Sequence, residues 1–209
     1  MFIKVCGLRE KVNIIAIDTL SIDFLGLIFY EKSPRFVENN TENHSDIPTT
    51  NASKVGVFVN SSLEYILGKI KKYQLKYIQL HGNESIDFVK EIYQKIKEKN
   101  IKIIKAISID NEIDNVFLSA FVPFCDYFLF DTKGTNHGGN GVKFNWQILQ
   151  DYQLKTPFLL SGGISVDDIV EIKNIKHTQF AGIDINSKFE IKAGLKDVKM
   201  IENFIENLK

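Results

Sequence analysis

The chain has few of the residues that mark several common protein classes. Its 209 residues include two cysteines, four prolines and one tryptophan. Two cysteines cannot build a disulfide framework, so we expect a reducing compartment, and four prolines exclude a long proline-rich linker. Lys and Arg number 26, as do Asp and Glu, so the formal net charge is zero. A neutral chain argues against nucleic acid as a nonspecific partner.

Long hydrophobic runs are also missing. No apolar run reaches the roughly 18 residues of a membrane-spanning helix, so we expect no membrane contact. Residues 1–6 are apolar but too short for the core of a signal peptide, and no basic segment precedes them. We therefore expect a cytoplasmic protein. Because no shift in composition marks a boundary, residues 1–209 are predicted to form one domain.

Short apolar segments recur along the chain at steady intervals. Most are four to seven residues long, rich in β-branched and aromatic side chains, and not strictly alternating. This pattern is typical of strands that are buried on both faces. The eight segments begin near Phe2, Phe24, Val55, Tyr77, Ile101, Tyr127, Phe158 and Phe180.

Several of the intervening segments carry apolar residues at helical spacing. The stripes are Leu63, Ile66, Leu67 and Ile70; Phe88, Ile92 and Ile96; and Ile201, Phe204, Ile205 and Leu208. Eight strands alternating with helices predict an α/β fold, a single closed (β/α)₈ TIM barrel. Residues 38–54 are polar and carry no stripe, so we expect an irregular, solvated loop where a helix would follow the second strand.

In a barrel of this kind the active site lies at the carboxyl ends of the strands. Chemically capable residues collect at these predicted positions. They are Cys6, Lys32, Ser33, Arg35, Asn60, His81, Asp131, Ser161, Gly162, Gly163 and Asp184. The fold prediction therefore also predicts that these residues share one end of the barrel.

The two cysteines are predicted to differ in role. A free cysteine is usually a small buried hydrophobe, but Cys6 ends the first strand, where function is expected. Cys125 precedes the sixth strand, which places it at the opposite end of the barrel, so we expect a core residue. The separation of the two ends, about 17 Å, excludes a disulfide between them.

Asp131 and the glycine-rich segments are the other candidates. An apolar setting after Phe128-Leu129-Phe130 suits a general acid, although an N-cap or a partner for Lys133 would explain Asp131 equally well. Gly162-Gly163 and residues 184–187 follow the seventh and eighth strands, where barrels often bind phosphate. Residues 134–141 contain a second glycine cluster without the Walker ending, which we interpret as a loop that could close over the site.

The basic residues carry weaker signals. Arg35 could pair with a carboxylate or phosphate, although exposed arginines are often simply solvated. The four histidines lack metal-ligand spacing, so no metal is predicted. Lys4 and Lys105 lie within predicted strands, where a structural lysine is favoured over one that forms a Schiff base.

Eight short segments of the chain, taken in order, match the pattern of a known family. They are KVCGL at 4–8, FYEKSPRFV at 29–37, KVGVFVN at 54–60, IQLHGNES at 78–85, FDT at 130–132, GGNG at 138–141, LSGGI at 160–164 and GIDINSKFE at 182–190. In this order the chain resembles the phosphoribosylanthranilate isomerases of tryptophan biosynthesis, over nearly its whole length. The cysteine segment, SPRFV and QLHG are the specific parts of the resemblance.

The resemblance implies an Amadori rearrangement of N-(5-phosphoribosyl)anthranilate without a cofactor. It implies Cys6 as general base, Asp131 as general acid and Arg35 at the anthranilate end of the substrate. The remaining implied contacts are Gly162, Gly163, Asn186 and Ser187 around the phosphate, with His81 and Asp184 lining the pocket. Because a free thiol is mostly protonated at pH 7, we expect either the site or the bound substrate to lower the pKa of Cys6.

Three positions depart from the family pattern, and two other functions stay open. Lys188 replaces a common glycine, Asn140 a threonine and Asn145 an aspartate. One alternative is the histidine-pathway isomerase, but that enzyme uses a carboxylate at the position of Cys6. The other is a non-catalytic barrel that binds phosphosugars. The sequence shows no conspicuous exposed apolar stripe, so a monomer is the default expectation.

Overall fold

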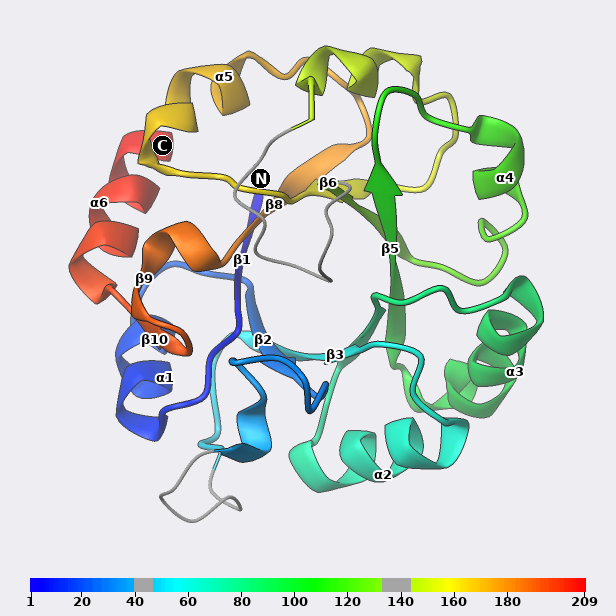
Figure 1. The fold of residues 1–209 in the computed structure, drawn as a ribbon, viewed down its shortest axis with the longest axis horizontal. Helices are drawn as coiled ribbons and strands as arrows, with labels where there is room; N and C mark the ends of the chain where they lie inside the picture. Colours follow the sequence, from blue (N-terminus) through cyan, green and yellow to red (C-terminus); the bar gives the residue numbers. More distant parts are fainter. Residues whose placement is uncertain (40–46, 133–143) are drawn as a thin grey trace.

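The computed structural model of the chain describes residues 1–39, 47–132 and 144–209. Eight parallel strands close into a barrel, in which β1 hydrogen-bonds to both β2 and β8. In Figure 1 the strands form an inner ring that is surrounded by helices. The strands are β1 (Phe2–Cys6), β2 (Phe24–Ile28), β3 (Ser53–Phe58), β4 (Tyr77–Leu80), β5 (Lys102–Ile109), β6 (Tyr127–Thr132), β7 (Phe158–Leu160) and β8 (Phe180–Ile185).

The barrel confirms the fold expected from the apolar segments. The largest difference in where a strand begins is at β3, which starts at Ser53 rather than Val55. The reason is the register with β2, where Phe24 pairs with Ser53 and Leu25 with Lys54. Two polar residues therefore belong to the strand, and the loop predicted over residues 38–54 ends earlier than expected.

Helices cover the outside of the barrel. They are α1 (Lys11–Asp18), α2 (Leu63–Tyr73), α3 (Ile86–Ile96), α4 (Asn115–Ser119), α5 (Ile169–Asn174) and α6 (Val198–Leu208). The three predicted apolar stripes lie on α2, α3 and α6. Ser62, Ser85 and Asp197 begin these helices, each accepting a backbone N–H bond with its side chain, which satisfies one of the open donors of the first turn. None of the helices in the described ranges has the length and apolar character needed to cross a bilayer.

Two connections lack a full helix. After β2 the described residues contain only the 3₁₀ helix Val37–Asn39, as expected for this loop, and residues 40–46 lie outside the description. After β6 the described residues contain the 3₁₀ helix Trp146–Asp151, which begins where Asn145 accepts the N–H of Gln147. An asparagine oxygen can fill the capping role of the aspartate that is common at this position.

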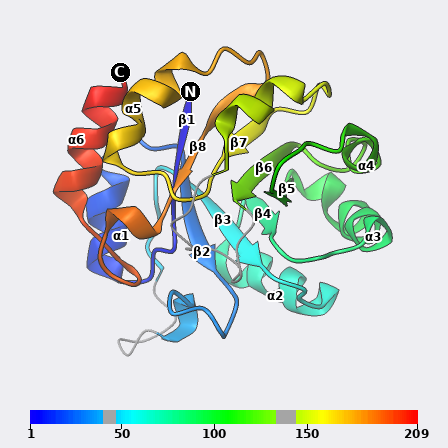
Figure 2. The same ribbon diagram turned by 45° about the horizontal axis from the view of Figure 1, so that its top comes forward.

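An additional hairpin lies between β8 and α6. The 3₁₀ helix Ser187–Phe189 leads into antiparallel β9 (Glu190–Lys192) and β10 (Leu195–Lys196). The hairpin packs beside α1, and α1 lies next to α6 in both views (Figures 1 and 2). It therefore brings a late segment of the chain close to the end of β1.

The opposite end of the barrel interior is closed by aromatic rings. Phe2, Phe24, Tyr77 and Tyr127 are the first residues of their strands. Their ring centroids are 5.4 Å apart for Phe2–Phe24, 4.9 Å for Phe24–Tyr77, 6.4 Å for Tyr77–Tyr127 and 6.3 Å for Tyr127–Phe2. The four contacts form a closed cycle of aromatic rings at this end of the barrel.

Candidate active site

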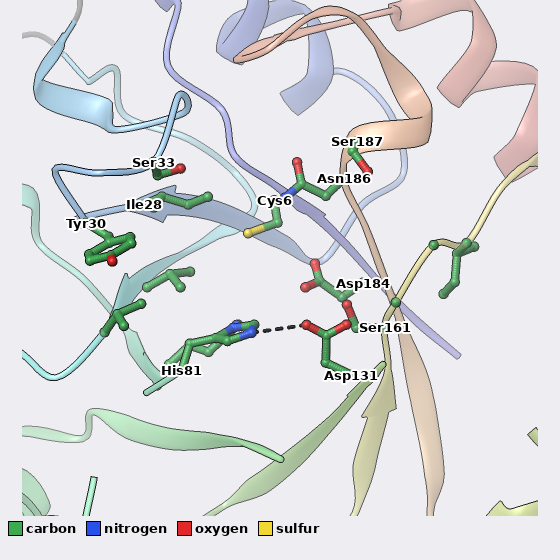
Figure 3. Close-up of a pocket in the computed structure, with 16 residues that line it drawn as sticks. Cys6, Ile28, Tyr30, Ser33, His81, Asp131, Ser161, Asp184, Asn186 and Ser187 are labelled. Atoms are coloured by element: carbon green, nitrogen blue, oxygen red, sulfur yellow. Dashed lines mark hydrogen bonds and ion pairs between the residues drawn. The ribbon is translucent and has the colours of Figure 1, made fainter. Parts of the chain in front are cut away.

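A cavity opens at the carboxyl ends of the strands, the end at which function was expected. Eight of the nine predicted site residues line it. These are Cys6, His81, Asp131, Gly162, Gly163, Asp184, Asn186 and Ser187. Figure 3 shows that Cys6, Asp131 and Asp184 face the cavity from three different strands.

Beneath the cavity lies a buried ion pair. Lys4 and Cys6 are two residues apart on β1, so both side chains point into the barrel. The Lys4 ammonium lies 2.9 Å from Asp184 Oδ1, and Lys4 is paired with Asp184 in the register of β1 and β8. Lys105 is likewise held by Glu84, at 3.0 Å. Both lysines are thus held by buried carboxylates, which is the setting that the structural interpretation expects.

Cys6 is almost fully buried, at 4% exposure. Burial raises the pKa of its thiol, against the opposing effect of the Lys4 ammonium, with Asp184 adding to the rise and Lys196 opposing it. The expectation that the site itself lowers this pKa is wrong, because desolvation disfavours the thiolate more than the ammonium groups favour it. The bound substrate is the remaining source of the charge that would favour the thiolate.

Asp131 belongs to a chain of three polar side chains. His81 Nε2 lies 3.1 Å from Asp131 Oδ2, and Gln79 Nε2 lies 2.7 Å from His81 Nδ1 (Figure 3 draws the first contact). If the Gln79 amide donates to Nδ1, the ring proton lies on Nε2 and is donated to Asp131. Gln79 is fully buried, and its Oε1 has no hydrogen-bond partner among the described residues.

The loop after β7 depends on glycine. Gly162 and Gly163 have φ values of +93° and +70°, a region that side chains with a Cβ rarely adopt. A Cβ on Gly162 would also lie 2.3 Å from Thr132 Oγ1. Both glycines line the cavity, and Asn186 and Ser187 line it from the end of β8. A backbone without side chains allows an anion to approach closely.

Of the nine site residues that the resemblance implies, Arg35 is the one that does not line the cavity. Lys32 and Asn60, which follow their strands in the sequence, do not line it either. Its Nε lies 2.9 Å from Glu190 Oε1 and its Nη2 lies 2.7 Å from Glu190 Oε2, a two-point ion pair that draws the guanidinium toward the hairpin. The stem of Arg35 lies against Gly7, where an added Cβ would approach Arg35 Cδ to 2.7 Å. Arg35 therefore lies beside Gly7, the residue that follows Cys6.

Sequence reasoning missed Glu190 and Lys196. Lys196 Nζ lies 2.7 Å from Glu190 Oε1, and both side chains are almost completely buried. Hydrogen bonds from Arg35 and the charge of Lys196 outweigh burial and hold the pKa of Glu190 below its ordinary value. Burial lowers the pKa of Lys196 to about 8, despite the opposing effect of Glu190. Neither residue stands out in the sequence, because acidic and basic residues near a hairpin are usually solvated.

Other predicted residues lie outside the cavity or outside the described part of the chain. Cys125 is buried near the start of β6 and both cysteines are free, as expected. Lys188 is exposed to solvent. Within the three described ranges, no group of three or more His, Cys, Asp and Glu side chains has a metal-binding arrangement. Lys133 and the glycine cluster at 138–141 lie outside the described residues.

Comparison with known proteins gives the site a context. Residues 3–207 match the family model described as N-(5′-phosphoribosyl)anthranilate (PRA) isomerase. A relative of that name from Parabacteroides distasonis is 44% identical over 100% of this chain and 93% of its own length. The chain belongs to the phosphoribosylanthranilate isomerase family.

Solved members of the phosphoribosylanthranilate isomerase family have the same barrel. The enzyme from Thermotoga maritima superposes with a TM-score of 0.82 at 28% identity, covering 100% of this chain and 98% of that one. Another member was solved in complex with reduced 1-(o-carboxyphenylamino)-1-deoxyribulose 5-phosphate, with a TM-score of 0.76, 27% identity and the same coverage. These matches confirm the resemblance and the expected enzyme class, and they do not favour the histidine-pathway alternative.

Proposed function

We propose that this chain catalyses the Amadori rearrangement of N-(5′-phosphoribosyl)anthranilate to 1-(2-carboxyphenylamino)-1-deoxyribulose 5-phosphate, a step of tryptophan biosynthesis. The observation that carries the proposal is the shared cavity of Cys6 and Asp131. A thiol and a carboxyl group reach it from separate strands, in a chain that belongs to the phosphoribosylanthranilate isomerase family. An acid and a base on two sides of one substrate are what this rearrangement needs.

The proposed reaction has two proton transfers. Asp131 gives its proton to the ring oxygen of the ribose, the C1′–O bond breaks, and the nitrogen lone pair forms a cationic imine. The Cys6 thiolate then removes the C2′ proton, whose bonding electrons form a C1′=C2′ bond and neutralise the nitrogen. The resulting enolamine tautomerises to the aminoketose. Each positioned transfer contributes about 10²–10⁴ in rate.

The burial of Cys6 makes the order of these steps important. Because burial raises the pKa of its thiol, the thiol form prevails before substrate binds. Ring opening creates a positive charge on the imine next to Cys6, which favours loss of the thiol proton to water and so favours the thiolate. We therefore propose that the Cys6 thiolate forms only after Asp131 has opened the ring, and that the charge of the bound substrate drives its formation.

The two anionic ends of the substrate fit different parts of the site. The phosphate is placed at the backbone of Gly162 and Gly163 with Asn186 and Ser187, where N–H groups can donate. The anthranilate carboxylate is assigned to Arg35, whose Nη1 edge lies opposite the edge that pairs with Glu190. Four of the apolar side chains that line the cavity are assigned to the aromatic ring: Ile28, Tyr30, Val57 and Val59. His81 and Asp184 face the sugar between these ends.

A monomer in the cytoplasm completes the proposal. The exposed large apolar side chains of the described residues are spread over several elements, including Val12 on α1, Val116 on α4, Val170 on α5 and Ile191 on β9. Such scattered residues do not require a partner. Two buried free thiols suit a reducing compartment. Light scattering of the purified protein would measure one chain per particle, and a stable dimer would contradict the monomer.

Turnover of freshly generated N-(5′-phosphoribosyl)anthranilate by the purified protein, without added metal or cofactor, tests the proposed reaction. The histidine-pathway aminoaldose serves as the matched second substrate. We expect product from the first and none above background from the second. A folded protein that turns over neither substrate would be the binding-only barrel, and turnover of the second alone would replace the proposed substrate.

A further inference from the structure

Lys196 is a buried cation that the proposed acid and base do not use. Its side chain is fully buried, and its Nζ donates to three oxygens: Asn186 O at 3.1 Å, Asn186 Oδ1 at 2.7 Å and Glu190 Oε1 at 2.7 Å. Its backbone is held by the buried Asn13 of α1, which donates to Lys196 O at 2.9 Å and accepts from Lys196 N at 2.7 Å. The ammonium group is thus fixed from both sides.

The contacts of Lys196 lead to two separate parts of the cavity. Asn186 lines it and has an irregular backbone, with φ −146° and ψ −99°, directly before Ser187. Glu190 holds the guanidinium of Arg35 through two oxygens. A single ammonium group therefore joins the loop that lines the cavity after β8 to the arginine that follows β2.

The charges of this cluster also depend on Lys196. Arg35 and Glu190 alone form a neutral pair, which would attract an anion weakly, and Lys196 brings the cluster to a net charge of +1. Beneath the cavity Lys4 is already paired with Asp184, and Asp131 contributes a carboxyl group to the cavity. A ligand with anionic groups at both ends needs positive charge that is not cancelled locally.

We propose that Lys196 is a positioning residue that ties Arg35, through Glu190, to the Asn186–Ser187 loop and keeps this cluster positively charged for a doubly anionic substrate. The inference rests on the proposed function, because it concerns the two ends of that substrate. It assigns Lys196 to substrate binding rather than to proton transfer. Loss of Lys196 therefore raises KM much more than it lowers kcat.

Binding and turnover at pH 7 test the role of Lys196. The probe is reduced 1-(o-carboxyphenylamino)-1-deoxyribulose 5-phosphate, measured by calorimetry on the wild type, Lys196→Met, the double variant Glu190→Gln/Lys196→Met, and Lys192→Met as control. Lys192 lies on the same hairpin but is exposed. We expect Lys196→Met to bind about tenfold more weakly or worse, with kcat within about threefold. Lys192→Met should match the wild type.

The double variant tests the charge balance. It removes one cation and one anion, so the net charge of +1 returns while the link between Arg35 and the Asn186–Ser187 loop stays broken. We therefore expect it to recover only the part of the lost affinity that depends on charge, and full recovery would contradict the positioning role. Unchanged binding in a folded Lys196→Met protein, or no recovery in the double variant, would overturn the inference. If either of these results is found while the wild type still turns over substrate, the Lys196 inference fails but the proposed function does not. A wild type that binds no probe and turns over no substrate would overturn both.

The pH dependence of probe binding by the wild type is a second test, and it does not require any variant to fold. Among the described residues, the charged groups near Lys196 Nζ are Glu190 on β9 and Arg35 after β2, the titratable thiol of Cys6 on β1 also lies near it, and α1 adds the neutral Asn13. Between pH 7 and pH 9 Lys196 loses its proton, with its pKa of about 8, whereas Glu190, whose pKa is lowered, stays ionised. We expect the Kd of the probe to rise across this range, and a flat profile would contradict the inference.

Discussion

Gln79 illustrates how one buried side chain can prepare another for catalysis. Its amide contacts His81 Nδ1, and His81 Nε2 contacts the carboxyl group of Asp131, so the orientation of the amide selects the tautomer that Asp131 meets. The unpartnered Oε1 of Gln79 would accept from Nδ1–H if the amide turned over. That orientation suits the state in which Asp131 holds a proton.

Replacing Gln79 with leucine should therefore impair the acid step. We expect Gln79→Leu to lower kcat about tenfold, the effect of losing one buried hydrogen bond of about 1.4 kcal/mol in the transition state, with KM changed less than about twofold. Nitrogen NMR of the His81 ring would show the altered tautomer. Gln150→Leu, at an exposed position, is the control. An unchanged pair of ring signals and an unchanged kcat would remove Gln79 from this role.

Residues differ in how far the sequence could identify them. Cys6, His81 and Asp131 could be found because each follows an apolar strand, and parallel strands bring their carboxyl ends together. The Arg35–Glu190 pair joins residues 155 positions apart, and no local pattern encodes that contact. The raised pKa of Cys6 was missed for a related reason, since burial depends on the whole set of neighbours.

At the scale of elements, the connection after β2 is held by charge instead of by a helix. Glu38, in the 3₁₀ helix, accepts from Lys69 Nζ at 2.6 Å, Lys72 Nζ at 3.0 Å and Tyr73 Oη at 2.7 Å, all on α2. Burial opposes ionisation, but the hydrogen bonds from Lys69, Tyr73 and Lys72 prevail and lower the pKa of Glu38 to about 2. The expected solvated loop is therefore anchored at Glu38.

Removing the charge of Glu38 should destabilise the fold in a pH-dependent way. The unfolded chain binds a proton at Glu38 more readily than the folded chain. The contribution of ionised Glu38 to the free energy of unfolding is therefore fully present above about pH 4.5 and is lost as the pH falls toward 2. At pH 7 we expect Glu38→Gln to cost about 1 kcal/mol, a Tm lowered by about 2–4 °C. Thermal melts from pH 7 to pH 3 should show the difference shrinking. Glu64→Gln, exposed on α2, should show none, and a constant difference would contradict the account.

At the scale of the molecule, one end of the barrel carries the candidate active site and the other end is closed by aromatic side chains. The carboxyl ends of the strands carry Cys6 and Asp131, while the opposite end is closed by the ring of Phe2, Phe24, Tyr77 and Tyr127. The alternation of apolar strands and helical stripes was sufficient to predict this barrel, since each signal is local. The hairpin β9–β10 was not predicted, because its short strands carry no apolar run and depend on contacts with α1 and the end of β8.

Substitution at the closed end should separate stability from catalysis. Phe24 is buried within the aromatic cycle. We therefore expect Phe24→Ala to lower the free energy of unfolding by about 3–5 kcal/mol, as measured by denaturant titration. We expect kcat of the folded fraction to stay within about twofold of the wild type, because the site lies at the other end. Phe117→Ala, at a half-exposed position on α4, should cost far less. A large fall in kcat with Phe24→Ala would show that the two ends are coupled.

The central claim is that Cys6 and Asp131 move protons in one cavity. The most direct test is the single-turnover rate of Cys6→Ser and Asp131→Asn on saturating N-(5′-phosphoribosyl)anthranilate, with probe affinity measured on the same preparations and Cys125→Ala as control. We predict that each active-site variant binds the probe within about threefold of the wild type and loses at least about 10²-fold in rate. Cys125→Ala should keep its rate. A near-wild-type rate in either active-site variant would contradict the assigned acid or base.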